Sequence, residues 1–145
     1  PISDLILPAI ERMRLQSERS GLKLEVEIAE NLPLIHVDAE RIEQVLVNLI
    51  HNAIKFTPAG GSILVSANQA GNEILISVKD TGIGIPEKDL PHIFERFYKV
   101  DPARATGGTG LGLAIARHLV EAHQGRIWAE SKEGEGARFI LALPV

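Results

Sequence analysis

The sequence predicts a two-layer α/β sandwich, in which three main helices cover a mixed sheet of about five strands. Three segments carry apolar residues at the three- and four-residue spacing of a helix with one buried side. Other short segments alternate apolar and polar residues, as half-buried strands do. The chain has 145 residues, of which 45% are apolar and 23% are charged. These values fit a single domain with room for a core.

The first helix is expected to begin at Ser3 or Asp4, either of which has the side chain of an N-terminal cap. Pro8 is awkward inside a helix, so we expect it to mark the true first turn. Ser20 and Gly21 end the helix. The residues expected on its buried side are Ile6, Ile10 and Met13.

The central helix is the most strongly patterned segment of the chain. Residues 24–28 before it alternate and predict a strand, whereas residues 34–37 form a short strand at best. Asp38 is a good N-terminal cap, and the helix runs to about Phe56, because Pro58 disfavours helical geometry at the residue before it. Its buried side is predicted to carry Ile42, Val45, Leu46, Leu49, Ile50 and Ala53.

A β-hairpin is predicted next, from strands at 62–67 and 73–79 that meet around residues 70–72. A short helix is expected at 87–93. Residues 100–108 lack periodicity and end in small residues, so we interpret them as a mobile loop.

The last part of the chain predicts a helix over 110–124, closed by Gly125. Strands at 126–131 and 137–143 follow. The expected buried side of the helix carries Leu111, Ile115, His118, Leu119 and Ala122, so that His118 is interpreted as a core residue.

Composition excludes several classes of function. A net charge of -4 argues against binding to nucleic acid or to a membrane surface through bulk positive charge. The absence of cysteine excludes a thiol nucleophile, a disulfide frame and a zinc–thiolate site. No apolar run approaches the roughly 20 residues that cross a bilayer. Because the chain begins at Pro1 without a signal peptide, we expect a cytoplasmic domain of a longer protein, with any membrane anchor outside it.

A polar stripe lies on the central helix, where Asn48, Asn52 and Lys55 fall at positions i, i+4 and i+7. Such a stripe is often no more than a solvated face. Alternatively, carboxamide oxygens ligate a hard cation while the ammonium group reaches a phosphate.

An Asp-x-Gly-x-Gly motif, residues 80–84, directly follows a predicted strand. The motif is either a structural turn or the floor of a base pocket. In the second case, the carboxylate of Asp80 accepts a hydrogen bond from an exocyclic amine, which adenine has and guanine lacks at the same position. Gly82 and Gly84 would let the backbone approach a flat base closely.

A glycine-rich run, residues 107–113, opens the last helix. Amide groups at a helix N-terminus attract phosphate, although the same run also suits a flexible hinge. It is neither a Walker A loop nor a convincing Rossmann fingerprint, because no Gly-Lys-Ser/Thr follows and a loop precedes it. Among the aromatic residues before this run, Phe94 and Phe97 are expected to pack in the core. Lys99 and Arg104, which are basic, are candidate contacts for phosphate.

Together and in this order, the motifs resemble the ATP-binding domain of sensor histidine kinases, of the GHKL superfamily and the Bergerat fold. The resemblance covers residues 1–145, with an ATP lid at about 94–109. Residues 126–131 and 139–144 are also typical of histidine kinases. The resemblance implies that the domain binds ATP and Mg²⁺, with Asn52 and Asn48 near the metal ion. The expected ATP-binding residues are Asn48, Asn52, Lys55, Asp80, Gly82, Gly84, Ile85, Tyr98, Lys99, Gly108, Thr109, Gly110, Leu111 and Gly112.

The same resemblance implies a reaction that needs other partners. ATP would donate its γ-phosphoryl group to a histidine on a dimerisation domain of the same protein, and a response regulator would receive it. None of the five histidines here lies in the family's His-Glu/Asp-x-x-x-Pro motif, so no catalytic residue is assigned. One departure is Ala137, where the family's pattern has threonine. A nucleotide sensor without transferase activity, or an ATPase of the gyrase type, remains an alternative.

Overall fold

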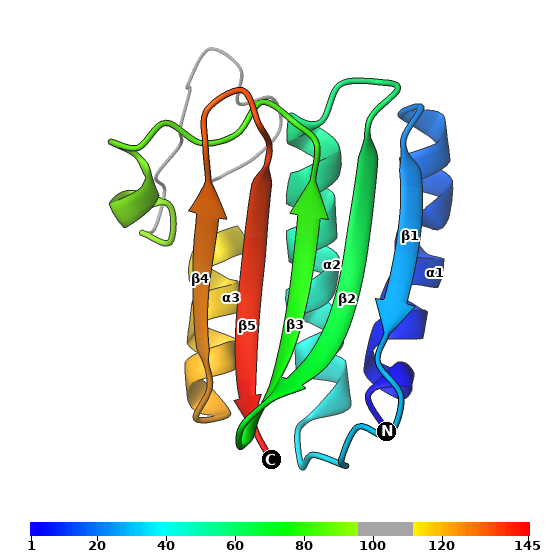
Figure 1. Cartoon of the computed structure of the whole chain (residues 1–145), viewed down its shortest axis with the longest axis vertical. Coiled ribbons are helices and arrows are strands. Elements are labelled where there is room, and N and C mark those ends of the chain that lie inside the picture. The colour runs from blue at the N-terminus through cyan, green and yellow to red at the C-terminus, as the bar shows by residue number, and fades with distance from the viewer. Residues whose placement is uncertain (96–111) are drawn as a thin grey trace.

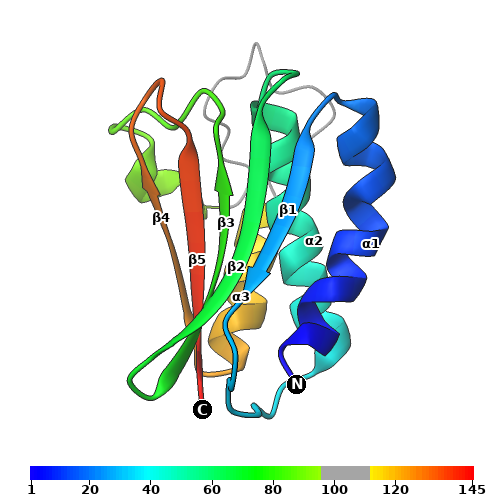
Figure 2. The ribbon, with the colours of Figure 1, turned by 45° about the vertical axis from the view of Figure 1, so that its right-hand side comes forward.

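The computed structural model describes residues 1–95 and 112–145. Its single sheet has the strand order β1-β2-β3-β5-β4, and three helices cover one face of it (Figures 1 and 2). β1 pairs parallel to β2, whereas the other neighbouring strands are antiparallel. The predicted two-layer sandwich with a mixed sheet is therefore confirmed. The elements are α1 Ser3–Arg19, β1 Lys23–Ile28, α2 Ala39–Phe56, β2 Ser62–Ala70, β3 Glu73–Asp80, the 3-10 helix η1 Leu90–His92, α3 Gly112–Ala122, β4 Arg126–Ser131 and β5 Ala137–Pro144.

Helix α2 lies at the centre of the helical layer and forms as the sequence predicts. Asp38 is extended and caps the helix, because its carboxylate accepts the backbone N–H of Arg41 at 3.3 Å. Thr57 leaves the helix in an extended conformation before Pro58. The predicted apolar side is buried against α1, α3 and the sheet. Its residues are Ile42, Val45, Leu46, Leu49, Ile50, Ala53 and Ile54.

The hairpin of β2 and β3 places the site-bearing strand in the middle of the sheet. The two strands pair from Ala70 opposite Glu73 to Ile63 opposite Asp80, so the turn consists of Gly71 and Asn72. β5 pairs along the other edge of β3. Both edges of β3 are thus hydrogen-bonded, which fixes the position at which the strand ends.

Helix α1 differs from its prediction at the start. It begins with Ser3, and the residue at the cap position is Ile2, which makes no side-chain cap hydrogen bond. Pro8 lies inside the helix rather than in its first turn. The helix tolerates this proline because its buried side packs on the core over several turns.

Two short elements also differ from expectation. Residues 34–37 form no strand, and Leu34 is 69% exposed. The helix expected at 87–93 is reduced to η1, which follows turns at 87–89. Pro91 falls at the start of η1, where a helix needs no backbone N–H from it. Proline is therefore tolerated here, but it does not extend the helix.

The buried side of α3 is predicted correctly at Leu119 and wrongly at His118, Ala122 and Ile115. His118 and Ala122 are exposed, and Ile115 is 40% exposed, whereas Ala116, Leu119 and Val120 are buried. The helix packs on α2 and β4, and this packing selects a side rotated by about one residue from the predicted one. The expected core position Leu111 and the loop expected at 100–108 lie outside the described residues.

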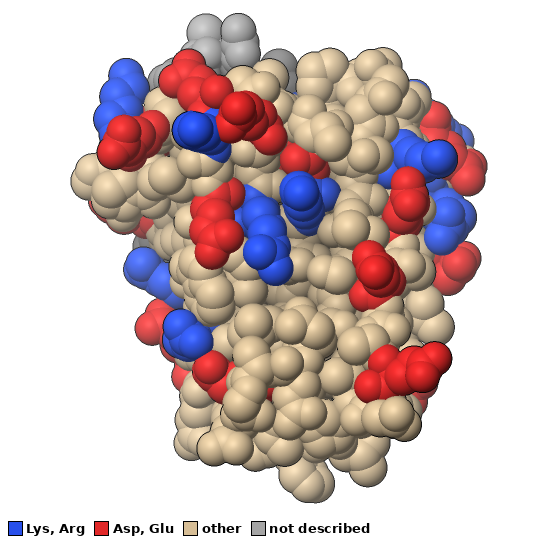
Figure 3. Space-filling view, in the orientation of Figure 1, with Lys and Arg blue, Asp and Glu red and all other residues tan. Residues whose placement is uncertain are grey.

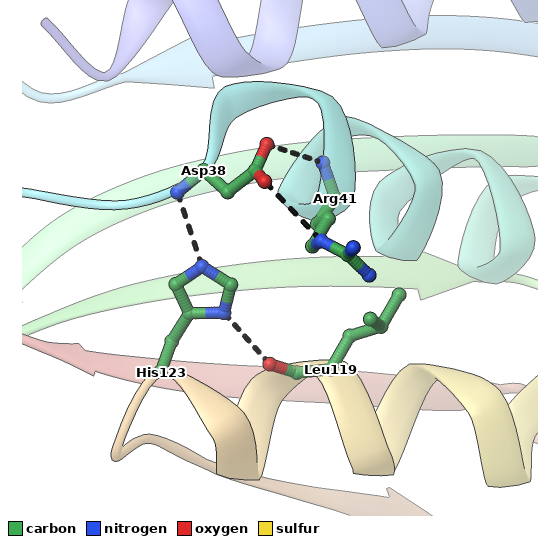
Figure 4. A network of polar contacts seen from close by, with 4 residues as sticks. All are labelled: Asp38, Arg41, Leu119 and His123. Atoms are coloured by element: carbon green, nitrogen blue, oxygen red, sulfur yellow. Dashed lines mark hydrogen bonds and ion pairs between the residues drawn. The ribbon is translucent and has the colours of Figure 1, made fainter.

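A polar contact ties the start of α2 to the end of α3, at the end of the sheet away from Asp80 (Figure 4). The backbone N–H of Asp38 donates to Nε2 of His123 at 3.0 Å. Nδ1 of the same ring lies 2.8 Å from the carbonyl oxygen of Leu119 and therefore donates to it. The imidazole ring thus bridges the two helices through both of its nitrogens.

No helix within residues 1–95 or 112–145 lies over the other face of the sheet (Figure 2). Figure 3 shows charged side chains across the upper part of this face and none in its lower central part. Ser77 and Ile140 are nevertheless buried there by their neighbours, and Ser77 shares a 2.6 Å hydrogen bond with Ser66. Across residues 1–95 and 112–145, no helix has the length and apolar character to span a membrane.

The burial of Leu49 gives a test of the packing between α2 and the sheet. Leu49 is fully buried, so Leu49→Ala should lower the free energy of unfolding by ~2–5 kcal/mol. Leu34→Ala removes the same atoms from a side chain that is 69% exposed, so it should change the free energy of unfolding by ~0.5 kcal/mol or less. Urea unfolding followed by circular dichroism measures both values. Equal losses in the two variants would contradict the packing described.

Candidate functional site

Three segments meet at the upper end of the sheet in Figure 1: the end of α2, the loop after β3 and the loop between β4 and β5. The N–H of Ile83 donates to the carbonyl of Phe56, the last residue of α2, at 3.2 Å. The carbonyl of Ile83 accepts the N–H of Gly134, in the loop between β4 and β5, at 2.7 Å. The loop after β3 is therefore held from both sides by main-chain hydrogen bonds.

Asp80 is the last residue of β3 and lies on its core-facing side, at 4% exposure. Its Oδ1 accepts the N–H of Gly82 at 2.9 Å and the N–H of Ala137 at 3.1 Å. No partner for Oδ2 is found among residues 1–95 and 112–145. The carboxylate is thus anchored by one oxygen, which leaves the other as a fixed acceptor for a donor from outside the chain.

Burial raises the pKa of Asp80 above its ordinary value of 3.8, because the charged carboxylate loses water. The hydrogen bonds from Gly82 and Ala137 act in the opposite direction, since they stabilise the charged form. A buried acid with a raised pKa and an acceptor not used by the fold is typical of a binding site rather than of a structural turn.

Gly82 and Gly84 have a packing role that the sequence did not predict, besides the expected approach to a base. A Cβ on Gly82 would lie 2.3 Å from the carbonyl oxygen of Phe56. Gly84 has a φ of +74°, and its Cβ would lie 2.3 Å from the carbonyl oxygen of Lys132. Both glycines therefore allow the loop to pack against its own protein neighbours, and this contact alone requires them.

The polar stripe on α2 faces the start of α3. Nδ2 of Asn48 donates to the carbonyl of Gly112, the first residue of α3, at 3.4 Å. Asn52 and Lys55 are partly buried, and Nζ of Lys55 lies 5.5 Å from the ring centre of Phe56. Lys55 makes no ion pair with any residue in 1–95 or 112–145, so its ammonium group is available to an anionic ligand.

The donor set on α2 suits a magnesium ion that also binds a phosphate. The contact with Gly112 uses the amide nitrogen of Asn48, so the carbonyl oxygen of this side chain remains an acceptor. Asn52 supplies a second carboxamide one turn later. Mg²⁺ prefers oxygen ligands and usually keeps waters and phosphates beside one or two protein groups. Within the described ranges, no group of three or more His, Cys, Asp or Glu residues is placed to hold a metal ion.

The remaining predicted site residues divide into two groups. Ile85 is buried beside Asp80's loop, and Phe94 packs edge-on against Phe139 with ring centres 6.1 Å apart, as expected for a packing residue. The others lie in 96–111, outside the described residues. They are Phe97, Tyr98, Lys99, Arg104, Gly108, Thr109, Gly110 and Leu111. His51 is exposed, and among residues 1–95 and 112–145 no contact places it in the site.

The loop between β4 and β5 was not predicted to belong to the site. Ala137 contributes its backbone N–H to Asp80, and Ser131 bonds to the loop after β3 through its hydroxyl group. The pattern Gly-Glu-Gly at 134–136 indicates a turn, but it does not indicate that this turn lies beside Asp80. Nothing in the spacing of Ser131 indicates that its partner lies 46 residues away.

Comparison with protein families agrees with this geometry. The family model described as histidine kinase-, DNA gyrase B- and HSP90-like ATPase matches residues 37–145. This range contains α2, the loop after β3 and both strands that flank the last glycine turn.

Two curated relatives come from Bacillus subtilis. The sensor histidine kinase WalK is 46% identical over 143 residues, which cover 93% of this chain and 23% of WalK. The sensor histidine kinase YclK is 40% identical over 148 residues, which cover 100% of this chain and 31% of YclK. The chain therefore spans less than a third of the length of these two proteins.

Solved structures agree in fold over almost the whole chain. The catalytic domain of histidine kinase ThkA is 31% identical with a TM-score of 0.85, covering 99% of this chain and 93% of that one. Full-length ShkA in complex with AMPPNP is 34% identical with a TM-score of 0.88, covering 99% and 30%. ThkA was also solved in complex with the response regulator protein TrrA, at 28% identity and a TM-score of 0.82, covering 99% and 40%.

The raised pKa of Asp80 makes a prediction about stability. Between pH 3.8 and its folded pKa, Asp80 binds protons more readily in the folded state than in the unfolded state, so stability falls as pH rises through this range. Asp80→Asn should abolish this loss, and the variant should be more stable than the native chain at pH 7. The advantage should shrink as the pH falls from the folded pKa to 3.8, and it should be lost below 3.8.

Chemical denaturation at a series of pH values measures this difference. Asp4→Asn is the matched control, since Asp4 lies in the exposed first turn of α1, where a negative charge is favourable. The control should gain no stability at pH 7. A difference between Asp80→Asn and the native chain that grows as pH falls would overturn the assignment.

Proposed function

Since the chain belongs to the histidine kinase-, DNA gyrase B- and HSP90-like ATPase family, as the ATP-binding catalytic domain of a sensor histidine kinase, we propose that it presents Mg-ATP to a histidine on a separate dimerisation domain of the same protein. The phosphoryl group then passes to an aspartate on a response regulator, a kind of partner that ThkA binds in its solved complex. The observation that carries the proposal is the buried carboxylate of Asp80, which is anchored by Oδ1 while Oδ2 has no partner among residues 1–95 and 112–145. ATP as substrate also favours a cytoplasmic location, which the absence of cysteine suits.

Asp80 is assigned to the adenine base. Its Oδ2 accepts a hydrogen bond from the exocyclic amine of adenine, while Gly82 and Ala137 keep the carboxylate from rotating. Guanine presents an oxygen at the corresponding position, which a carboxylate repels. A polar group left without its partner in a buried site strongly disfavours the wrong ligand, so this contact selects ATP over GTP.

The stripe on α2 is assigned to the phosphates. Lys55 supplies a positive charge to them, and Asn48 and Asn52 supply carboxamide oxygens to Mg²⁺. When bound, Mg²⁺ neutralises negative charge on the phosphates. The glycines expected to cradle the phosphates at 108–110 lie outside the described residues and remain a prediction, whereas Gly112 begins α3 beside Asn48.

The transfer itself needs a nucleophile from outside this chain. A ring nitrogen of the acceptor histidine attacks the γ-phosphorus, the bond from that phosphorus to the β,γ-bridging oxygen breaks, and ADP leaves. The attacking nitrogen enters as the unprotonated one, so no base in this chain is required. Positioning and charge neutralisation account for most of the catalysis of phosphoryl transfer.

The ATPase alternative is disfavoured by Asn48. By resemblance, gyrase-like members carry a glutamate at this position to activate water. A carboxamide cannot take a proton from water, and the amide nitrogen of Asn48 is engaged with Gly112. This side chain is thus suited to ligation rather than to base catalysis.

The proposed function is tested by mixing this chain with the phosphoacceptor domain of the parent protein and ATP labelled at the γ-phosphate. Label should appear on the acceptor domain only when both proteins are present, in a bond that is labile to acid. Asp80→Asn should bind ATP roughly 10- to 100-fold more weakly, and transfer at low ATP should fall by a similar factor.

Each alternative has a distinct result in this experiment. ATP binding without transfer would support the nucleotide sensor, and rapid release of free phosphate would support the ATPase. Covalent, acid-labile phosphate on this chain in the absence of the acceptor domain would contradict the prediction that the nucleophile lies outside this chain. Retained affinity in Asp80→Asn would place the base elsewhere.

The metal assignment predicts a change in the response to Mg²⁺. Asn52→Ala removes a carboxamide oxygen, so ATP affinity should rise less on addition of Mg²⁺ than it does in the native chain. Calorimetric titration of ATP with and without Mg²⁺ measures this. Asn68→Ala removes an exposed carboxamide from β2, far from the site, and should keep the native response. The ligand role of Asn52 is rejected if its variant responds like the control.

A further inference from the structure

Ser131, the last residue of β4, makes two short hydrogen bonds through one hydroxyl group. The N–H of Ile85 donates to Oγ at 2.7 Å, and the hydroxyl donates to the carbonyl of Gly136 at 2.8 Å. Ile85 belongs to the loop after β3, and Gly136 belongs to the loop between β4 and β5. The half-buried hydroxyl group thus links both loops that hold Asp80.

The carbonyl of Gly136 belongs to the same peptide group as the N–H of Ala137. That N–H is one of the two donors to Oδ1 of Asp80. A peptide group is planar and rigid, so a tilt at its carbonyl end also moves its N–H. Ser131 therefore holds one end of the peptide group whose other end holds the carboxylate, and bonds in such a series strengthen one another.

Packing and hydrogen bonding both act on this peptide group. Gly136 is pressed against the backbone of Asp80, since a Cβ on it would lie 2.2 Å from the carbonyl oxygen of Asp80. A hollow of about 240 Å³ also borders Asp80, Ser131, Gly136 and Ala137, and beside it the hydroxyl group of Ser131 holds the carbonyl of Gly136. Without the hydroxyl group, the carbonyl of Gly136 and the N–H of Ile85 lose this shared partner.

We propose that Ser131 is a positioning residue for the base: it orients the Gly136–Ala137 peptide group, which fixes the carboxylate of Asp80 so that Oδ2 faces the exocyclic amine of adenine. This inference rests on the proposed role of Asp80 and adds to it a residue that need not touch the nucleotide. It also assigns selectivity for the amine to a serine on β4, which β5 separates from β3, rather than to the Asp-x-Gly-x-Gly motif alone.

The test compares ATP with purine riboside triphosphate, which lacks the exocyclic amine and is otherwise the same ligand. The ratio of the two dissociation constants in the native chain measures the contact with Asp80. In Ser131→Ala, ATP should bind about tenfold more weakly while the analogue binds almost as before, so the ratio should fall towards one. Ser131→Thr keeps the hydroxyl group and should restore the ratio.

Two further variants separate positioning from general destabilisation. Ser66→Ala removes a serine hydroxyl that is hydrogen-bonded to Ser77 in the same sheet, away from Asp80, and should leave the ratio unchanged. If Ser131→Ala does not fold, Ser131→Cys serves instead, because a thiol of similar size is a weak donor and acceptor and should also lower the ratio. Folding of every variant is checked by circular dichroism.

The outcomes distinguish this inference from the proposed function. If the native chain binds both ligands equally or binds neither, the role assigned to Asp80 fails. If the native chain prefers ATP and the Ser131→Ala or Ser131→Cys variant keeps the full ratio, the inference about Ser131 is wrong. An equal loss of affinity for both ligands would also overturn it, since it would indicate a structural effect without a role in selectivity.

Discussion

The site depends on one constraint, which is that a carboxylate must be buried at the end of a central strand and still keep an acceptor free. β3 is hydrogen-bonded on both edges, so it delivers Asp80 to a fixed place. Both internal hydrogen bonds of the carboxylate fall on Oδ1 and come from main-chain N–H groups. Burial raises the pKa of Asp80, and the fold tolerates this cost because the two donors offset part of it.

Helix α2 connects this carboxylate to the proposed phosphate end of the site. Its apolar side is the centre of the core, and its polar stripe meets the start of α3. Its last carbonyl receives the N–H of Ile83, so the helix also sets the height of the loop after β3. Because one helix carries both kinds of contact, core packing around α2 sets the distance between the end of that helix and its polar stripe, where the base and phosphate subsites are proposed.

Local signals explain most of what the sequence could predict. Asp38, Pro58 and the apolar spacing of α2 act within a few residues, and the hairpin is marked by its own turn. Which side of a helix is buried was harder to predict from the sequence. Leu111 and Ile115 indicated one side of α3, but contacts with α2 and β4 buried the side that carries Ala116 and Val120. Ser131 was missed for a related reason, since its partner Ile85 lies 46 residues earlier and its spacing is that of an ordinary strand end.

Ala137 departs from the threonine of the family's pattern, and the geometry at Asp80 explains how the chain accommodates it. What Asp80 receives from position 137 is a main-chain N–H, which nineteen of the twenty standard residues supply equally well. Proline is the exception, because it has no such hydrogen. Position 137 can therefore drift in side chain, within the limit of a buried site, while the bond to the carboxylate persists. The hydrogen bond to Asp80 thus requires an amide hydrogen at position 137 and no particular side chain.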